Sequence, residues 1–243
     1  MAPTRRPDAV AGTTRGRLSL TSALRWVAVT GVLAGAVLYS NWLLEMAFTR
    51  SLPDADLFIS ELAAADQPHG EWFRACDLAA AVVLAVAAAA ALVAVRGDRW
   101  IRAGWWALGV FAVTTALDSS IWMLVCAPSS DAACAAREAS GTVPIGHQLH
   151  LFSSVVGVLA AIASLFAFVV VALRERAPLP VRRVGLFLLA ALIGTSVWTT
   201  AVVAIDSAVG TGAAEVGIAQ RVQLVAIAGW LVFVAYRTAR ARA

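Results

Sequence analysis

Charged side chains at the ends of apolar segments are the residues of this sequence most able to do chemistry. A charge near the centre of a membrane helix costs about 2.5–3.5 kcal/mol, so each one calls for an explanation. An apolar setting would keep Asp118 protonated near neutral pH, which makes it a candidate proton donor. Six such residues are expected in the outer third of the bilayer: Glu45, Arg74, Asp77, Asp118, Asp206 and Arg221.

These charges also allow a structural interpretation, in which they pair and lock a helix bundle. Arg74 and Asp77 are three residues apart, so an ion pair on one helix face forms easily. Arg221 could meet Asp206 or Asp118 across the bundle. We interpret the two arginines and Asp206 as structural, with Arg221 also able to line a substrate site, and the other three acids as catalytic candidates.

Three of the nine tryptophans are expected beside acids, on the outer halves of their helices. Carboxylates next to indole rings could protonate an alkene or an epoxide and shelter the resulting cation. An outer aromatic belt that adjoins helix-end acids is the alternative interpretation. The pairs expected to share a helix face are Trp42 with Glu45, Trp122 with Asp118, and Trp198 with Asp206.

The three histidines, His69, His147 and His150, are all expected on the outer side of the membrane. His147 and His150 share one face at the start of a helix, and Ser154 continues that face. With His69 and a carboxylate they could bind zinc. Two histidines at a membrane interface are, however, more often hydrogen-bonded surface or capping residues.

The cysteines indicate a disulfide. Cys126 and Cys134 lie eight residues apart in one outer loop, in a compartment that permits disulfide formation. We predict a structural disulfide here, because a redox pair of the quinone-reductase type would require a CxxC motif, which the sequence lacks. Cys76 is expected to be a small buried apolar residue.

Composition identifies the environment that holds these residues. Of the 243 residues, 60% are hydrophobic and 14% are charged, and the mean hydropathy is +0.80. Soluble domains carry about 25% charged residues, so the composition excludes a soluble enzyme, a disordered protein and a nucleic-acid binder. Only a bilayer covers so much apolar surface. Every cationic side chain is Arg, which excludes a lysine Schiff base and suggests a high-GC, actinobacterial type of genome.

The elements follow from segment length and from the distribution of arginine. Fifteen of the nineteen arginines fall on one side if the helices alternate, so both termini are predicted to be cytoplasmic. We expect one all-α domain over 25–237, a bundle of six transmembrane helices in the cell inner (plasma) membrane, with a disordered basic arm at 1–24 and a basic tail at 238–243. The six predicted spans are 26–46, 75–95, 103–125, 149–173, 184–205 and 218–236.

Several short motifs resemble a bacterial and archaeal family of six-helix membrane proteins. They are Ser60-Glu61-Leu62-Ala63 followed by Phe73-Arg74 and Asp77, Asp118 before a Cys-bearing loop, His147 to His150 followed by Ser153, and Gln220-Arg221. The family is known only as a domain of unknown function, the nine-ninety-eight family, and the resemblance covers about residues 27–236. It implies six helices and no particular reaction. The family-pattern positions that it marks are Ser60, Asp77, Asp118, His147 and Arg221.

Three functions remain open. The first is a membrane-embedded enzyme without a cofactor that acts on a membrane lipid or isoprenoid by acid–base chemistry, in a pocket of carboxylates and tryptophans with Ser60 at its edge. The second is a zinc-dependent lipid hydrolase that uses the three histidines, and the third is a transporter or assembly partner.

Terpene cyclases and lipid amidases of the membrane offer analogies for the first two functions, on architecture alone. The chain has Asn41-Trp42-Leu43-Leu44-Glu45 in place of the cyclase signature Asn-Ile-Ala-Trp-Glu, and it lacks the HxxxH spacing of the amidases.

Overall fold

The computed structural model describes residues 8–49, 57–94, 98–209 and 216–241, with side chains over 21–48, 57–94, 98–205 and 216–241. In this part of the chain every regular element is a helix, which confirms the all-α prediction. The elements are α1 (Asp8–Tyr39), η1 (Asn41–Leu44), α2 (Glu45–Thr49), η2 (Ile59–Ala63), α3 (Gly70–Ala94), α4 (Arg99–Asp118), α5 (Ala132–Ala139), α6 (Ile145–Arg174), α7 (Leu179–Val209) and α8 (Val216–Arg240), where η marks a 3-10 helix.

Several helices are long and apolar enough to cross a membrane, which makes the protein a multi-pass membrane protein. α4 has the required length but is not among them, and it contains three charged residues, Arg99, Arg102 and its last residue Asp118. Within the described residues the five qualifying segments are Thr21–Phe48, Gly70–Ala94, Ile145–Arg174, Leu179–Ile205 and Val216–Arg240.

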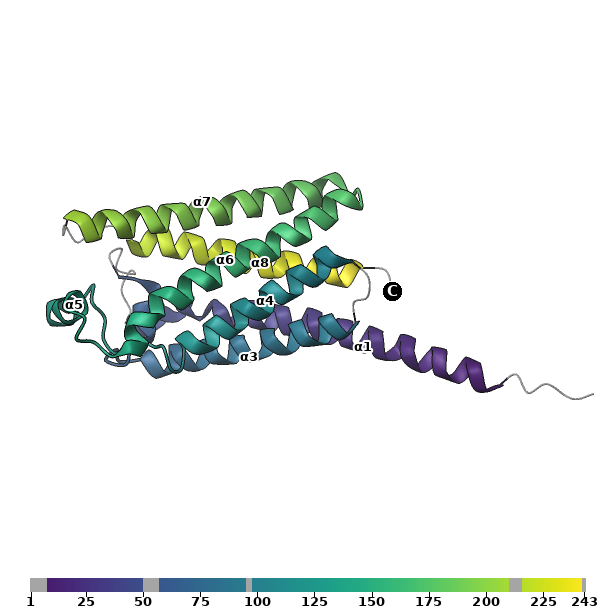
Figure 1. Cartoon of the computed structure of the whole chain (residues 1–243), viewed down its shortest axis with the longest axis horizontal. Coiled ribbons are helices and arrows are strands. Elements are labelled where there is room, and N and C mark those ends of the chain that lie inside the picture. Colours follow the sequence, from purple (N-terminus) through teal and green to yellow (C-terminus); the bar gives the residue numbers. More distant parts are fainter. Residues whose placement is uncertain (1–7, 50–56, 95–97, 210–215, 242–243) are drawn as a thin grey trace, which may run out of the picture.

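The long helices form a bundle in which α7 lies at the periphery (Figure 1). α1 packs on α3 and α8, α3 on α4, α4 on α6, and α6 on α8, so these five helices surround a common core. α7 packs on α6 and α8 from outside. Only 6% of its most apolar window is buried, against 56% for α6, so most of α7 is available to the membrane.

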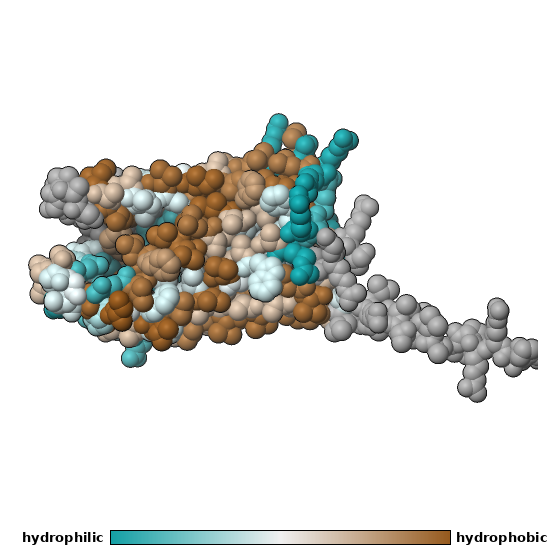
Figure 2. Space-filling model, in the orientation of Figure 1, coloured by the Kyte–Doolittle hydropathy of each residue, from teal (hydrophilic) through white to brown (hydrophobic). Residues whose placement is uncertain are grey.

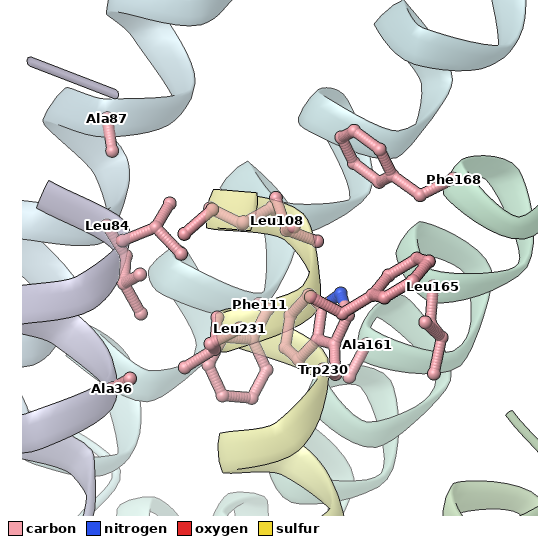
Figure 3. Packing of buried hydrophobic residues seen from close by; sticks show 14 of the residues in the cluster. Ala36, Leu84, Ala87, Leu108, Phe111, Ala161, Leu165, Phe168, Trp230 and Leu231 are labelled. Atoms are coloured by element: carbon pink, nitrogen blue, oxygen red, sulfur yellow. The ribbon is translucent and has the colours of Figure 1, made fainter. Parts of the chain in front are cut away.

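Large apolar side chains from α3, α4, α6 and α8 fill the centre of the bundle (Figure 3). The rings of Phe111 and Trp230 meet edge to face with centroids 5.1 Å apart, and the Trp230 indole N–H donates to Ser164 Oγ at 3.2 Å. α1 approaches α3 closely, because a Cβ atom at Gly35 would lie only 2.5 Å from Leu84. Small residues thus permit the close packing of these two helices.

The two ends of the bundle differ in chemistry. Figure 2 shows an apolar surface along most of the visible face, with hydrophilic side chains concentrated where α4 begins and α6 ends. We call this the arginine end, because eight arginines lie at the helix ends here: Arg99, Arg102, Arg174, Arg176, Arg182, Arg183, Arg237 and Arg240. The opposite end, which carries η1, α2, η2 and α5, is the disulfide end.

Hydrogen bonds join two loops across the disulfide end. The buried Glu61 carboxylate accepts from the Ser129 backbone N–H at 3.1 Å and from its hydroxyl at 2.6 Å. Asp66 Oδ2 accepts from the Ala127 N–H at 3.3 Å. Burial raises the pKa of Glu61 above its usual range, against the opposing effect of the Ser129 hydrogen bonds.

The predicted disulfide is confirmed. Cys126 and Cys134 are bonded, with their Cα atoms 6.1 Å apart, and the bond attaches α5 to the loop that follows α4. Cys76 is a free thiol and is half-buried rather than buried.

Several predicted boundaries differ from the structure. α1 begins at Asp8, within the segment expected to be a disordered arm, and α8 continues to Arg240, within the expected tail. Residues 1–7 and 242–243 lie outside the described residues. α4 ends at Asp118, not at 125, because the Ser119 and Ser120 hydroxyls bond back to backbone carbonyls one turn earlier and the chain turns.

Candidate functional site

Asp118 is the centre of a polar cluster at the disulfide end. It is the last residue of α4, and its side chain is 20% exposed. The Ser153 hydroxyl donates to Oδ1, and the Ser154 hydroxyl donates to Oδ2 at 3.1 Å. Both serines belong to α6, so two hydroxyls of one helix turn fix the carboxylate of another helix.

His150 completes this cluster from the preceding turn of α6. Its Nδ1 lies 3.1 Å from the Trp122 carbonyl oxygen and 3.4 Å from Asp118 Oδ1. A carbonyl oxygen can only accept, so Nδ1 carries the proton and Nε2 of the neutral ring is an acceptor. Nε2 is buried and has no hydrogen-bond partner in the described part of the chain. An imidazole held at Nδ1 with Nε2 open can take up a proton.

Asp77 lies near this cluster on α3. Its Oδ1 accepts from the Asn41 side-chain amide at 2.7 Å, and its charge interacts with those of Asp118 and, when ionised, Tyr39. Within the described residues, neither Asp77 nor Asp118 forms an ion pair with an arginine. These are two of the three acids that the sequence assigned to chemistry, and they are near enough for their charges to interact.

Glu45 has a different environment. It is 4% exposed, and Arg221 Nη2 lies 2.7 Å from its Oε2. Arg221 also donates to the Leu57 carbonyl at 3.4 Å. Asp118, one of the two predicted partners of Arg221, does not pair with it. The other predicted partner, Asp206, lies outside the residues whose side chains are described. Glu45 and Arg221 join the start of α2 to α8.

The predicted pair of Arg74 with Asp77 does not form. Arg74 Nη1 instead donates to the Ala63 carbonyl at 2.6 Å, and Asp77 accepts from Asn41. The reason lies in the close approach of η2 to the start of α3, where a Cβ atom at Gly70 would lie 2.1 Å from the Ala64 oxygen. The Arg74 side chain therefore bonds to a backbone carbonyl of η2 and not to Asp77 on its own helix.

A recess of about 260 Å³ opens at the disulfide end beside Glu45. The His69 ring stacks on Phe48 with centroids 4.5 Å apart, and Phe73 meets Phe48 edge to face. The walls are apolar and aromatic around a single carboxylate, which is already paired. The lining residues are Glu45, Phe48, Leu62, Gln67, Pro68, His69 and Phe73.

The three histidines have separate roles. His147 is 2% exposed and accepts the Val125 N–H at Nδ1, 3.2 Å away, so its proton is on Nε2, opposite to His150. His69 lines the recess and His150 contacts Asp118. Among the described residues, no three His, Cys, Asp or Glu side chains form a group that could hold a metal ion.

The tryptophans do not assemble as the helix-face argument predicted. Trp122 lies in the turn after α4, not on a helix face shared with Asp118, and its backbone carbonyl oxygen lies against His150. Trp198 lies on the peripheral α7 and is 36% exposed. Trp42 lies in η1 and is half-buried. Ser60 lies in η2 beside Ile59, whose N–H donates to Gln220.

Sequence reasoning missed the hydroxyl ligands of Asp118 and the amide ligand of Asp77. The spacing of His150, Ser153 and Ser154 already places all three on one helix face, and this signal could have predicted a shared partner. Asn41 lies in the segment that was compared with the cyclase signature, and that comparison gave no reason to expect a bond to Asp77.

Comparison with known proteins supports the family and adds no activity. No curated protein and no solved structure matches the chain. Residues 32–237 match the family described as "Protein of unknown function (DUF998)", in agreement with the short motifs around Asp77, Asp118 and His147. Since this match covers most of the sequence, the chain belongs to the DUF998 family.

Proposed function

We propose that the protein is a membrane-embedded enzyme that moves a proton on a lipophilic substrate, a lipid or an isoprenoid, at the disulfide end. The observation that carries the proposal is His150, whose Nδ1 is held by Trp122 and Asp118 while its buried Nε2 has no protein partner in the described chain. An ionisable group inside a membrane protein, kept without an arginine partner, is by default a functional candidate.

The roles follow from the contacts. His150 is the general base, and Asp118 orients its ring and stabilises the imidazolium that forms on protonation. Ser153 and Ser154 position Asp118. Asp77, held by Asn41, is a second carboxylate that can supply or receive a proton during an isomerisation or cyclisation.

The arrangement favours proton transfer over hydrolysis. The hydroxyl of Ser153 donates to Asp118 and not to His150, so the His150 base does not activate this serine as a nucleophile. The zinc-dependent alternative lacks a grouped set of ligands among the described residues. The three tryptophans that were expected to stabilise a cationic intermediate do not lie together. A cyclase that depends on them therefore receives less support than an isomerase.

We further propose the topology that this site requires. α4 is the sixth span, since it lies inside the bundle between α3 and α6. The arginine end faces the cytoplasm of the plasma membrane, both termini lie on that side, and the site opens on the outer leaflet. Figure 2 shows the visible face hollowed near the disulfide end, between α7 and the segments α5 and α6, which supports substrate access from the side.

A non-enzymatic function, as a transporter or assembly partner, is the second candidate. The observation in its favour is the Glu45–Arg221 pair, together with the Asn41–Asp77 bond, because both join separate helices as structural contacts would. Both candidates predict a folded protein. Only the enzyme requires Asp118 for a reaction that the folded protein carries out.

The test is lipid conversion by the purified protein. Vesicles of total bacterial lipid extract, with and without the protein, are incubated and compared by mass spectrometry. We expect a lipid species that accumulates with the natural protein and falls by about 100-fold or more in Asp118→Asn and His150→Gln, at unchanged melting temperature. Asp131→Asn, at the start of α5, is the matched control. No conversion by the natural protein would favour the second candidate. Conversion that survives in Asp118→Asn would refute the role assigned to Asp118.

A further inference from the structure

A second concave surface lies between α3 and α4, away from the Asp118 cluster. It is a groove of about 530 Å³ whose walls are almost wholly apolar. Gly109 and Ala88 form its floor, since a Cβ atom at Gly109 would lie 3.8 Å from Ala88 Cβ. The lining residues are Ala85, Ala88, Ala89, Leu92, Trp106, Gly109, Val110, Val113 and Thr114.

The groove runs along the membrane-spanning direction toward the arginine end. On α3 it extends from Ala85 to Leu92, about 10 Å at the rise of an α-helix. Trp106, 61% exposed, closes it toward the arginine end. An open channel of this length and polarity matches part of a lipid acyl chain.

Arg102 extends the same face of α4 beyond Trp106. The two residues are four positions apart, so Arg102 lies one turn nearer the arginine end on the face that lines the groove. Arg102 is exposed and forms no ion pair with an acid in the described part of the chain. Arg99, by contrast, lies against an indole, with its guanidinium 5.7 Å from the Trp100 ring centroid.

We infer that this groove binds one anionic phospholipid from the leaflet at the arginine end. The acyl chain lies between α3 and α4 against Gly109 and Ala89. The phosphate lies at Arg102, and the Trp106 ring lies at the level of the headgroup, where tryptophan is favoured. Charge complementarity at Arg102 selects this occupant over a helix of another subunit, which would present no phosphate to the arginine.

Two substitutions separate the chain contact from the headgroup contact. Ala89 is an exposed lining residue, so Ala89→Leu fills the groove without changing the core, and Ala190→Leu on exposed α7 is its control. Arg102→Gln removes the headgroup contact, and Arg183→Gln, an exposed arginine at the same end, is its control. None of these residues belongs to the Asp118 cluster.

The measurement is retention of added phosphatidylglycerol or phosphatidylcholine by the delipidated protein, observed by native mass spectrometry. We expect the natural protein to prefer phosphatidylglycerol, Ala89→Leu to lose both lipids, and Arg102→Gln to lose about fivefold in preference while keeping the chain contact. Both controls should match the natural protein.

The inference would be overturned if Ala89→Leu retained each lipid as well as the natural protein does. Conversion of a dimer into a monomer by Ala89→Leu with unchanged lipid retention would also overturn it, because the groove would then be a helix–helix interface.

Discussion

The Glu45–Arg221 pair should be a major contributor to stability, and its size can be worked out from the structure. The charged atoms are 2.7 Å apart, and the side chains of Glu45 and Arg221 are 4% and 13% exposed. At an effective dielectric constant of about 20 the Coulomb attraction is about 6 kcal/mol, which desolvation partly offsets. Removal of one partner from a buried pair costs about 3–5 kcal/mol, because the remaining charge is left buried.

We therefore expect Glu45→Gln and Arg221→Gln each to lower the free energy of unfolding by about 3–5 kcal/mol. The double variant should recover much of this loss, since neither amide leaves a buried charge. The quantity to measure is the free energy of unfolding in mixed detergent micelles, for the single and double variants in one cycle.

A second pair in the same protein supplies the control. Arg237 Nη2 lies 2.5 Å from Glu175 Oε2, but the Glu175 side chain is 55% exposed. Glu175→Gln should therefore cost no more than about 1 kcal/mol. If Glu45→Gln costs as little as Glu175→Gln, or if the double variant is no more stable than the singles, the assignment of a buried, coupled pair is refuted.

Three further predictions concern the disulfide end and the topology. The free energy of unfolding should fall as the pH rises from the ordinary Glu range toward the raised pKa of Glu61, because the native protein then binds more protons than the unfolded chain. Glu61→Gln should lack this part of the pH dependence; an unchanged profile would contradict the burial effect. Cys126 and Cys134 should react with a membrane-impermeant maleimide only after reduction, and labelling without reductant would exclude the bond. A reporter fused after Ala243 should report the cytoplasm and one within 129–140 the outside, and the reverse result would move the site to the other leaflet.

The helices and their local spacing could be predicted from the sequence, because apolar length and helix periodicity are local properties. The membrane environment, most span positions and the Cys126–Cys134 bond all followed from such properties. The predicted span at 103–125 continued past the end of α4, because Ile121, Trp122 and Leu124 continue the apolar pattern after Asp118. The end of the helix is determined by hydroxyl groups that bond back to its carbonyls.

Partners across the bundle could not be predicted, because helix periodicity says which face a residue occupies and not which helix faces it. Asp118 could have met Arg221 on the sequence alone. The structure pairs Arg221 with Glu45, because η1 and α2 continue from α1, which packs on α8. Asp118 consequently lies against α6, with His150 and Ser154.

The tautomer of His150 is the most direct test of the acid–base proposal, and it requires no substrate. Nitrogen NMR of the histidine-labelled protein, at a pH above the usual His range, reports which ring nitrogen carries the proton. We predict the proton on Nδ1 of His150, with Nε2 bare, and the opposite tautomer for His147, whose Nδ1 accepts from Val125. A His150→Gln variant assigns the signal. A protonated Nε2 on neutral His150 would contradict the account, because that nitrogen could then accept no proton from a substrate.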